Sequence, residues 1–298
     1  MTTSVDVSVC TYRRPQVVDT LASLAAQVLP AGCTLRVIVA DNDETPSAEA
    51  TVRKAAGDLD LDLTYVHAPS HNISRARNAC LEAARAEWFA CIDDDQLAVA
   101  GWIAAFLAEA DRGGWDAVLG QVKAVYREEA PAWIKACDLH STTPAMVDGK
   151  ILKGYAGNSM VRLAAVRARA LRFDEALGRQ GGEDDDFYYR LTDGGGTIGY
   201  APDAVVHEPV PSGRDNLEYL LKRNFRRGQS HGARLSQQHR GPARIAQIGL
   251  AGAKSGACLA GAAATAWSPS ARMRWLARGA LHAGAVARLA GVRELELY

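Results

Sequence analysis

The sequence has no excess of charge of either sign, because 34 lysine and arginine residues balance 34 aspartate and glutamate residues over 298 positions. A chain with no positive excess lacks the overall electrostatic signature of a nucleic-acid-binding protein. The balance hides an asymmetry: residues 1–213 contain 20 basic and 30 acidic residues, whereas residues 214–298 contain 14 basic and four acidic residues. We therefore expect an acidic body that attracts cations and a basic tail that attracts phosphates or an anionic membrane surface.

Paired cysteines and a targeting segment are also missing. None of the six cysteines belongs to a C-x-x-C pair, and Cys10 and Cys91 lie within apolar runs, where cysteine is usually a small buried residue. The N-terminus has neither the basic start nor the long apolar stretch of a signal peptide. These features predict a cytoplasmic protein, either free or peripheral on the inner face of the cell membrane.

The chain has no run of about twenty uncharged apolar residues, the length that a membrane span requires. Two helical stretches rich in alanine and glycine, residues 244–267 and 270–290, are interrupted by Lys254 and by four arginines, respectively. Trp267, Trp275 and the arginines suit helices that lie in a membrane interface. An ordinary helical pair packed on the rest of the protein explains the same pattern, and the sequence leaves both interpretations open.

The first hundred residues alternate short β-branched runs with helical patterns, which is typical of βαβ units and a mostly parallel, twisted sheet flanked by helices. Strands are predicted at residues 5–10, 35–40, 63–67 and 88–92, and helices at residues 15–27 and 74–86. Thr11, Asp41 and Asp93 directly follow three of these strands. Because ligands bind beyond the carboxyl ends of parallel strands, these three residues should converge on one crevice.

Beyond Gly120 the pattern is less regular. It predicts strands at residues 121–125 and 156–161, a helix at 185–191, and short strands near Ile198 and Val205. We interpret residues 121–213 as a second half of the same α/β domain and residues 214–298 as a basic helical region.

Two acidic clusters are the first candidates for chemistry. Asp93, Asp94 and Asp95 repel one another unless a cation neutralises them, and their oxygens suit Mg²⁺ or Mn²⁺ shared with substrate phosphates. A solvated acidic turn before a helix at residues 101–111 is the structural alternative. The second cluster, residues 183–186, follows two glycines that let the backbone approach a ligand closely. Its carboxylates either complement a helix N-terminus or include a base that accepts a proton from a substrate hydroxyl.

Seven short motifs, in order, then carry a resemblance. They are Val9-Cys10-Thr11-Tyr12-Arg13-Arg14, Val39-Ala40-Asp41-Asn42, Asn72-Ile73-Ser74-Arg75-Ala76-Arg77-Asn78, Asp93-Asp94-Asp95, Gly157-Asn158, Gly181-Gly182-Glu183-Asp184 and Val206-His207. Over roughly residues 4–230 the chain resembles inverting family 2 glycosyltransferases, and within them the bacterial exopolysaccharide group that includes succinoglycan glucosyltransferases. The resemblance implies a Rossmann-like GT-A fold in residues 1–213, with a nucleotide-binding half (1–120) and an acceptor half (121–213).

The resemblance also implies a role for each matching residue. The nucleotide-binding positions are Thr11, Tyr12, Arg14, Asp41, Arg77, Asp93 and Asp94. Asp95 matches the ligand of a Mn²⁺ or Mg²⁺ ion that bridges two phosphates, and His207 matches a further metal or diphosphate contact. Asp184, with Glu183 beside it, matches the catalytic base. Gln96 stands where many relatives have another acid.

Candidate contacts to the acceptor or the diphosphate come from two further features. Asn158 and Trp133 are candidates for hydrogen bonding to a sugar and for stacking on one. Arg223, Arg226 and Arg227 lie at helical spacing soon after His207 and present cations that suit a diphosphate or a lipid-linked acceptor. A core position for Trp133 and a solvated basic face for the arginines are the structural alternatives.

The function predicted is transfer of a sugar from a UDP-sugar to a saccharide or lipid-linked saccharide, with inversion at the anomeric carbon. A nucleotidyltransferase acting on a sugar phosphate is one alternative, but its phosphate loop would contain glycine, and residues 11–15 contain none. A non-catalytic module that binds sugar nucleotides is another. It has no need of the carboxylate pair Glu183-Asp184.

Overall fold

The computed structural model describes residues 3–295, which divide into two compact units. The first, which we call the sheet unit, contains the residues up to Lys123 together with Ser141–Pro209. The second, the helical unit, contains Ala124–His140 and the residues from Val210 onward. The sequence predicts a boundary at residue 213, whereas the two units meet between Pro209 and Val210. Residues 124–140, which the sequence grouped with the sheet, belong to the helical unit.

The sheet unit is built on an eight-stranded sheet in the order β3-β2-β1-β4-β9-β6-β10-β5. Its strands are β1 (Thr3–Thr11), β2 (Cys33–Asp41), β3 (Leu63–His67), β4 (Trp88–Asp93), β5 (Leu97–Ala98), β6 (Ala117–Val125), β9 (Asn158–Arg162) and β10 (Ile198–Pro209). The first four in this order pair in parallel, β9 is antiparallel to β4 and β6, and β5 is antiparallel to β10. A separate hairpin joins β7 (Met146–Val147) and β8 (Lys150–Ile151). The predicted α/β class is confirmed.

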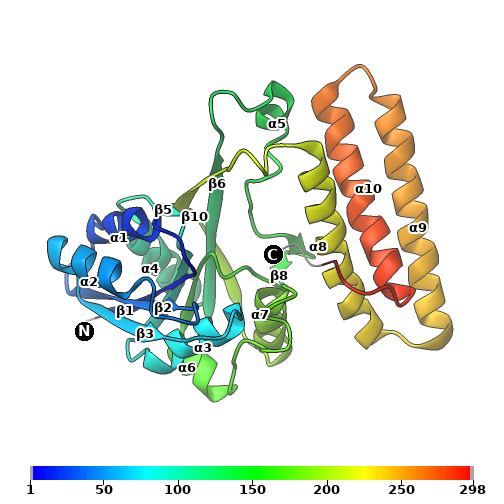
Figure 1. Ribbon diagram of the computed structural model, residues 1–298. Helices are drawn as coiled ribbons and strands as arrows, with labels where there is room; N and C mark the ends of the chain where they lie inside the picture. The colour runs from blue at the N-terminus through cyan, green and yellow to red at the C-terminus, as the bar shows by residue number, and fades with distance from the viewer. Residues whose placement is uncertain (1–2, 296–298) are drawn as a thin grey trace. The chain divides into compact units, whose positions relative to one another are not determined.

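Helices cover both faces of the sheet (Figure 1). One face carries α1 (Val17–Ala25), α2 (Glu49–Asp58) and α4 (Trp102–Gly113), and the other carries α3 (Ile73–Ala83), α6 (Leu163–Ala168) and α7 (Glu183–Asp193). In β2, Val37 and Val39 pack into one core while Ile38 and Ala40 pack into the other, as the alternation of strand side chains requires. Burial on both faces fixes the strands, and with them the loops at their carboxyl ends.

Strand β10 differs from the expectation of two short strands. It runs unbroken over 12 residues, with Pro202 in its middle. The partner strand β5 pairs only with Val206 and His207, so it does not reach the part of β10 that contains Pro202. A proline that donates no backbone hydrogen bond is tolerated in a strand where no ladder bond is required of it.

The helical unit contains α5 (Ala132–Cys137), α8 (Leu217–Gln238), α9 (Gly241–Ala264) and α10 (Pro269–Leu289). The two long tail helices that the sequence predicts are therefore present. Helix α10 packs against both α8 and α9, and none of the described helices is both long and apolar enough to cross a bilayer.

Candidate active site

The carboxyl ends of three parallel strands bring the predicted nucleotide-binding residues together. Thr11 at the end of β1 pairs with Asp41 at the end of β2, and Cys10 pairs with Asp93 at the end of β4. Thr11 and Asp41 are buried, at 2% and 0% exposure. The convergence predicted from the strand order is therefore present, and it lies at the edge where open α/β sheets bind ligands.

The turn after β4 is held by an arginine from the loop after β1. Arg14 Nη1 lies 3.0 Å from Asp94 Oδ1 and 2.5 Å from Asp95 Oδ2. Burial raises the pKa of Asp94, and Arg14 opposes that rise. Burial alone would lower the pKa of Arg14, but the carboxylates of Asp94, Asp95 and Asp93 raise it overall. A protein cation thus neutralises part of the acidic turn.

A second arginine links β4 to the start of α7. Arg77, on α3, forms an ion pair with Glu183 and lies 3.6 Å, Nη2 to Oδ1, from Asp93. Burial alone would lower the pKa of Arg77, but Glu183, Asp93 and Asp184 raise it overall. Removal from bulk water, followed by the charges of Asp95, Glu208 and Asp94, raises the pKa of Asp93 to about 7 against the opposing effect of Arg77. Half of the Asp93 side chain nevertheless stays open to solvent, at 45% exposure.

The start of α7 separates Glu183 from Asp184. Gly181 and Gly182 have φ angles of 81° and 94°, a left-handed conformation that favours glycine, and they let the helix begin abruptly at Glu183. Glu183 is buried, and burial followed by the charge of Asp184 raises its pKa against the effect of Arg77. Asp184 is only half-buried, and its Oδ1 accepts a 2.7 Å hydrogen bond from the Asp185 backbone N–H.

The four carboxylates of this helix turn are therefore not equivalent. Asp185 pairs with Lys153 at 2.8 Å and Asp186 pairs with Arg190 at 2.8 Å, while Glu183 pairs with Arg77. Among these four described side chains, Asp184 alone has no basic partner within 4 Å in the ion pairs of the structure. Its carboxylate is thus the one suited to accept a proton from a bound hydroxyl.

Asp41 organises the loop after β2. Its two oxygens accept hydrogen bonds from the backbone of Asp43 (3.0 Å) and Ala48 (2.8 Å) and from the Tyr65 hydroxyl (2.8 Å). Asp43 in turn forms a bidentate pair with Arg13, which lowers the pKa of Asp43 to about 2. Sequence reasoning did not find this pair, because it joins side chains from two different loops.

Tyr12 directly follows strand β1 and precedes Arg13 of the Arg13–Asp43 pair. Its ring meets the His71 ring edge-on with centroids 4.4 Å apart, and the Arg13 guanidinium lies 5.2 Å from the Tyr12 ring centre. The half-buried ring is therefore oriented by two neighbours from separate loops.

Asn158 and His207 lie on strands β9 and β10, not at the carboxyl ends of the parallel strands. The Asn158 side chain is 0% exposed, accepts a 2.8 Å hydrogen bond from Trp102 Nε1 and donates 2.9 Å bonds to the carbonyls of Gln121 and Ala204. Both ends of its amide are thus engaged in joining three strands and α4. His207 is half-buried on β10 and pairs with Leu97, just after the acidic turn.

The remaining predicted contacts belong to the helical unit. Trp133 is half-buried on α5, Arg227 is exposed on α8, and Arg223 donates a 3.3 Å hydrogen bond to the Leu139 carbonyl. Arg226 is buried and forms a 2.8 Å ion pair with Glu294. The spacing of the arginines on one helix did not reveal that Arg226 faces the interior, because that depends on how the C-terminal segment packs.

Sequence reasoning did not connect Gln96 with Glu208, which contact each other beside Asp93. Gln96, only 1% exposed, accepts a 3.1 Å hydrogen bond from the Asp93 backbone N–H and donates a 3.0 Å bond to Glu208 Oε2. The charge of Glu208 also acts on Asp93. The position of Glu208 directly after His207 was the available signal, but the link to Gln96 spans 112 residues and follows only from strand pairing.

The acidic turn offers carboxylate oxygens of the kind that bind a divalent cation, and Arg14 already contacts two of them. Among the residues that the structure describes, no group of three or more His, Cys, Asp and Glu side chains is arranged to hold a metal. Mg²⁺ is commonly bound by one or two protein carboxylates together with substrate phosphates. The oxygens of Asp95, at 23% exposure and beside Asp94, meet that requirement.

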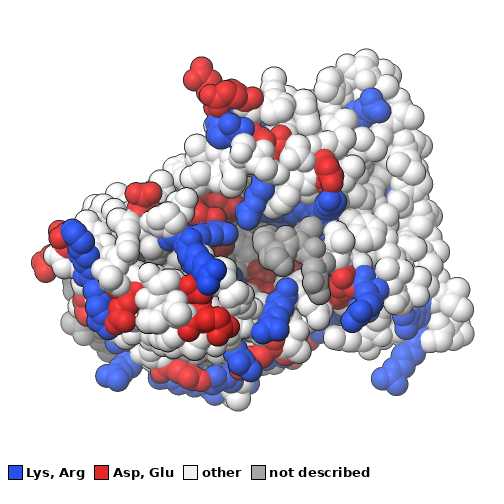
Figure 2. Space-filling model, viewed as in Figure 1, with Lys and Arg blue, Asp and Glu red and all other residues white. Residues whose placement is uncertain are grey.

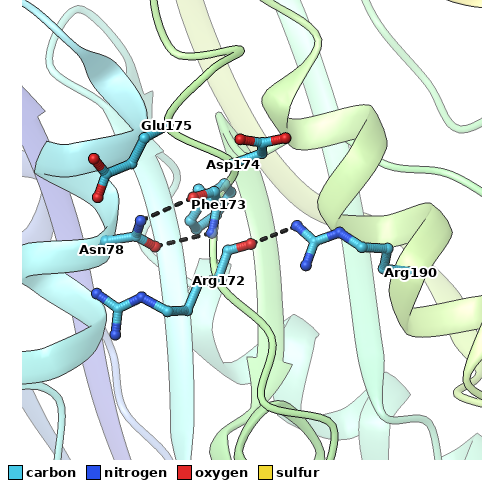
Figure 3. A pocket seen from close by; sticks show the side chains of 6 residues that line it. All are labelled: Asn78, Arg172, Phe173, Asp174, Glu175 and Arg190. Atoms are coloured by element: carbon cyan, nitrogen blue, oxygen red, sulfur yellow. Dashed lines mark hydrogen bonds between the residues drawn. The ribbon is translucent and has the colours of Figure 1, made fainter.

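The best-defined cavity near these elements, of about 520 Å³, lies between α3 and α7 and shares none of the predicted site residues (Figure 3). Asn78 exchanges hydrogen bonds of 2.9 and 2.8 Å with the Phe173 backbone on its wall. Its arginines are paired with acids, Arg172 with Glu82 and Arg190 with Asp186. The two arginines of this cavity are therefore already engaged by carboxylates.

A mainly parallel sheet with acidic residues beyond the carboxyl ends of its strands is typical of α/β proteins that bind nucleotides at that edge. The model of glycosyl transferase family 2 matches residues 6–169, and the chain belongs to this family. It is 44% identical, over 297 residues, to the succinoglycan biosynthesis protein ExoM of Rhizobium meliloti (strain 1021), covering 100% of this chain and 96% of that protein. The chain is therefore a glycosyltransferase.

Solved structures show the same fold at greater distance. The structure of residues 1–349 of S. aureus TarS has a TM-score of 0.55 at 21% identity, and the match covers 74% of this chain and 64% of TarS 1–349. The complex of the same TarS fragment with UDP-GlcNAc has a TM-score of 0.54 at 17% identity, covering 74% and 65%. The expected GT-A-like fold is thus confirmed.

Proposed function

We propose that the chain is an inverting glycosyltransferase that moves a sugar from a UDP-sugar to a saccharide or lipid-linked saccharide in polysaccharide biosynthesis. The observation that carries this proposal is the link from Asp93 through Arg77 to Glu183, which holds the acidic strand end and the start of α7 in one site. The UDP and UDP-GlcNAc complexes of TarS support a uridine nucleotide as the donor. The similarity to ExoM supports a polysaccharide product.

Asp184 is the residue we assign as the general base. An acceptor hydroxyl is a weak nucleophile, so a carboxylate removes its proton while the oxygen attacks the anomeric carbon. The new C–O bond forms on the face opposite the bond to UDP, which breaks with its electron pair going to the diphosphate oxygen. One such displacement inverts the anomeric configuration. Glu183 supports this step indirectly, because its pairing with buried Arg77 fixes the helix turn that presents Asp184.

The diphosphate needs positive charge as it leaves. Asp95 would hold a Mn²⁺ or Mg²⁺ ion, which supplies Lewis-acid stabilisation of the diphosphate when bound. Arg14 lies against Asp94 and Asp95, so its guanidinium adds a fixed cation at the same edge. Thr11, Tyr12, Asp41 and Asp93, at or just after the carboxyl ends of three parallel strands, are assigned to the uridine.

The donor assignment is tested by titrating UDP into the purified chain with Mn²⁺ and with EDTA. We expect binding with Mn²⁺ that weakens strongly with EDTA and in Asp95→Asn. Asp186→Asn is the matched control, because Asp186 pairs with Arg190 on the same helix and is not among the residues assigned to the nucleotide or the metal. Failure of UDP to bind under both conditions would overturn the uridine donor, and other sugar nucleotides would then be compared.

The base assignment is tested separately by Asp184→Asn. We expect turnover to fall by roughly 10²–10⁴-fold, the usual contribution of general base catalysis, while UDP affinity stays near that of the parent. Turnover is measured as UDP released from a panel of UDP-sugars with saccharide acceptors, and the anomeric configuration of the product by NMR. Parental turnover in Asp184→Asn, or a retained configuration, would contradict the mechanism.

A further inference from the structure

Helix α9 uses only one side for packing within the helical unit. Its buried residues, Ala251, Cys258 and Ala262, face α10, and Ser255 donates a 3.2 Å hydrogen bond to the Gly279 carbonyl. The opposite side, which we call the outer face of α9, is exposed along the whole helix and consists almost entirely of alanine, glycine and larger apolar residues. Only three of the 24 residues of α9 are buried, so the helix leaves an exposed apolar surface of the kind that marks an interaction site.

Larger apolar side chains of α9 are well exposed beside this alanine- and glycine-rich face, with Leu250 and Leu259, nine residues apart, on its two opposite edges. Ile245 is 71% exposed, Leu250 is 50% and Leu259 is 58%, and Trp267, three residues beyond the end of the helix, is 82% exposed. Figure 2 shows this flank of the helical unit as largely white, with no acidic side chains along α9. Lys254 is the one charged residue among the exposed positions from 241 to 267.

The charge of the surrounding helices identifies the chemistry of the partner. Residues 219–293 contain 13 basic residues and not one acid. Three of these bases are exposed close to α9 in the chain: Arg240, which caps the N-terminus of α9, and Arg272 and Arg278, which lie on α10. Apolar side chains with an interfacial tryptophan and surrounding bases are the features of helices that lie in the headgroup region of an anionic bilayer.

We propose that the outer face of α9 docks the protein on an anionic lipid surface. The helix would lie along the surface, since it is not apolar enough to span a bilayer. The alanine and glycine residues of the outer face enter the interface together with Ile245 and Trp267, Leu250 and Leu259 border this surface, and the bases contact lipid phosphates.

The test is flotation of the full chain with vesicles of phosphatidylcholine alone and of phosphatidylcholine mixed with phosphatidylglycerol. We expect the protein to float with the mixed vesicles and to bind the neutral ones roughly tenfold less. The fluorescence of Trp267, obtained as the difference between the parent and Trp267→Phe, should shift to shorter wavelength only with the mixed vesicles. Equal binding to both vesicle types would overturn the anionic specificity.

The double variant Ile245→Ser with Leu250→Ser removes apolar area without changing charge, and we expect it to bind mixed vesicles roughly tenfold less than the parent. Val28→Ser, at a 67% exposed position of the sheet unit, is the matched control and should bind as the parent does. Parental binding by the double variant would overturn the proposal. So would a dimer, seen by sedimentation, that the double variant dissociates and that does not bind vesicles.

Unfolding curves and UDP titrations accompany these measurements. Both substituted side chains are exposed, so we expect the double variant to match the parent in thermal unfolding and in UDP affinity. Loss of vesicle binding with unchanged thermal unfolding then reports on the α9 surface alone, whether or not the chain proves to use a UDP-sugar.

Discussion

Asp93 occupies its position because Gly157 has no side chain. A Cβ built on Gly157 would lie 2.5 Å from Asp93 Oδ2, closer than a side-chain carbon approaches such an atom, and 3.2 Å from Gln96 Nε2, a tight contact. The φ angle of Gly157 lies outside the left-handed range, so its backbone accepts any residue. The Gly157-Asn158 motif therefore reflects a need for space beside the acidic turn, and the two polar atoms nearest to it are those that orient Asp93.

The first prediction concerns this close approach. In Gly157→Ala the new methyl group should displace the Asp93 carboxylate and the Gln96 amide, and a displacement of about 1 Å in an active site lowers kcat/KM by up to about 100-fold. Gly57→Ala, where a Cβ meets nothing within 4 Å, is the control and should retain parental activity. Turnover and UDP affinity are measured on both. A fully active Gly157→Ala that folds normally would show that Asp93 does not need this position.

The residues of the site differ in how far the sequence could predict them. Thr11, Asp41 and Asp93 follow apolar strands directly, and strand order alone brings such residues to one edge. The contact of Gln96 with Glu208 depends on the pairing of β5 with β10, which no local pattern specifies. The sequence also groups Glu183 with Asp184, whereas only the structure separates a buried partner of Arg77 from an accessible carboxylate.

At the scale of elements, the crossing of α8 and α10 depends on glycines from both helices. A Cβ on Gly228 of α8 would lie 1.9 Å from the Leu281 carbonyl oxygen, and a Cβ on Gly284 of α10 would lie 1.9 Å from the Phe225 carbonyl oxygen. The backbones can approach this closely only where no side chain intervenes. Gly228 and Gly232 are also four residues apart on one face of α8, so they form a continuous groove for α10.

The second prediction tests this crossing. Gly284→Ala should force α8 and α10 apart and destabilise the helical unit by about 3 kcal/mol or more, as overpacking does in tight cores. Gly252→Ala, on the open side of α9 where a Cβ meets nothing within 4 Å, should stabilise by about 0.5–1 kcal/mol because alanine favours the helix. Denaturation followed by circular dichroism measures both. Equal stabilities would show that the helices are not held by this contact.

The elements themselves show where sequence patterns are sufficient. The strands up to residue 93 were predicted because each is a short apolar run bounded by polar residues. The sequence did not predict β10 as one continuous strand, and its Pro202 lies outside the part that pairs with β5. Arg226 was interpreted as part of a basic face because helical spacing is visible in the sequence, but the Glu294 that pairs with it comes from the chain beyond α10.

At the scale of the whole molecule, the stability of the protein depends on pH through groups that lie far apart in the chain. The pKa of Asp93 is raised to about 7, so its folded form gains protons, and stability rises, as pH falls from about 7 towards the ordinary value near 3.8. The pKa of Asp43 is lowered to about 2, so its contribution is lost only below the unfolded value of 3.8. Histidine at position 140 acts in the opposite direction to Asp93 over the same range.

His140 belongs to the helical unit, where its ring stacks on Tyr219 with centroids 6.0 Å apart and its Nε2–H donates a 3.0 Å hydrogen bond to the Arg214 carbonyl. Burial, followed by the charge of Arg223, lowers the pKa of His140 to about 4 against the effect of that hydrogen bond. The unfolded chain binds a proton near pH 6.5, whereas the folded chain does not until about pH 4. Protonation therefore favours unfolding in this interval.

The third prediction follows from that difference. The stabilising contribution of neutral His140 is complete above about pH 6.5 and is lost progressively as pH falls to about 4, by on the order of 1–2 kcal/mol after allowance for partial solvent screening. His140→Phe keeps an aromatic ring against Tyr219 but loses the hydrogen bond to Arg214, so this variant should be less stable than the parent at neutral pH. Because phenylalanine cannot bind a proton, the stability of the variant should decline less than that of the parent on acidification. Urea denaturation of both proteins at about pH 7 and about pH 4.5 gives the comparison, because the contributions of Asp93 and Asp43 are common to both and cancel in the difference. A parent and a variant that lose the same stability between these two pH values would show that His140 titrates alike in the folded and unfolded chains.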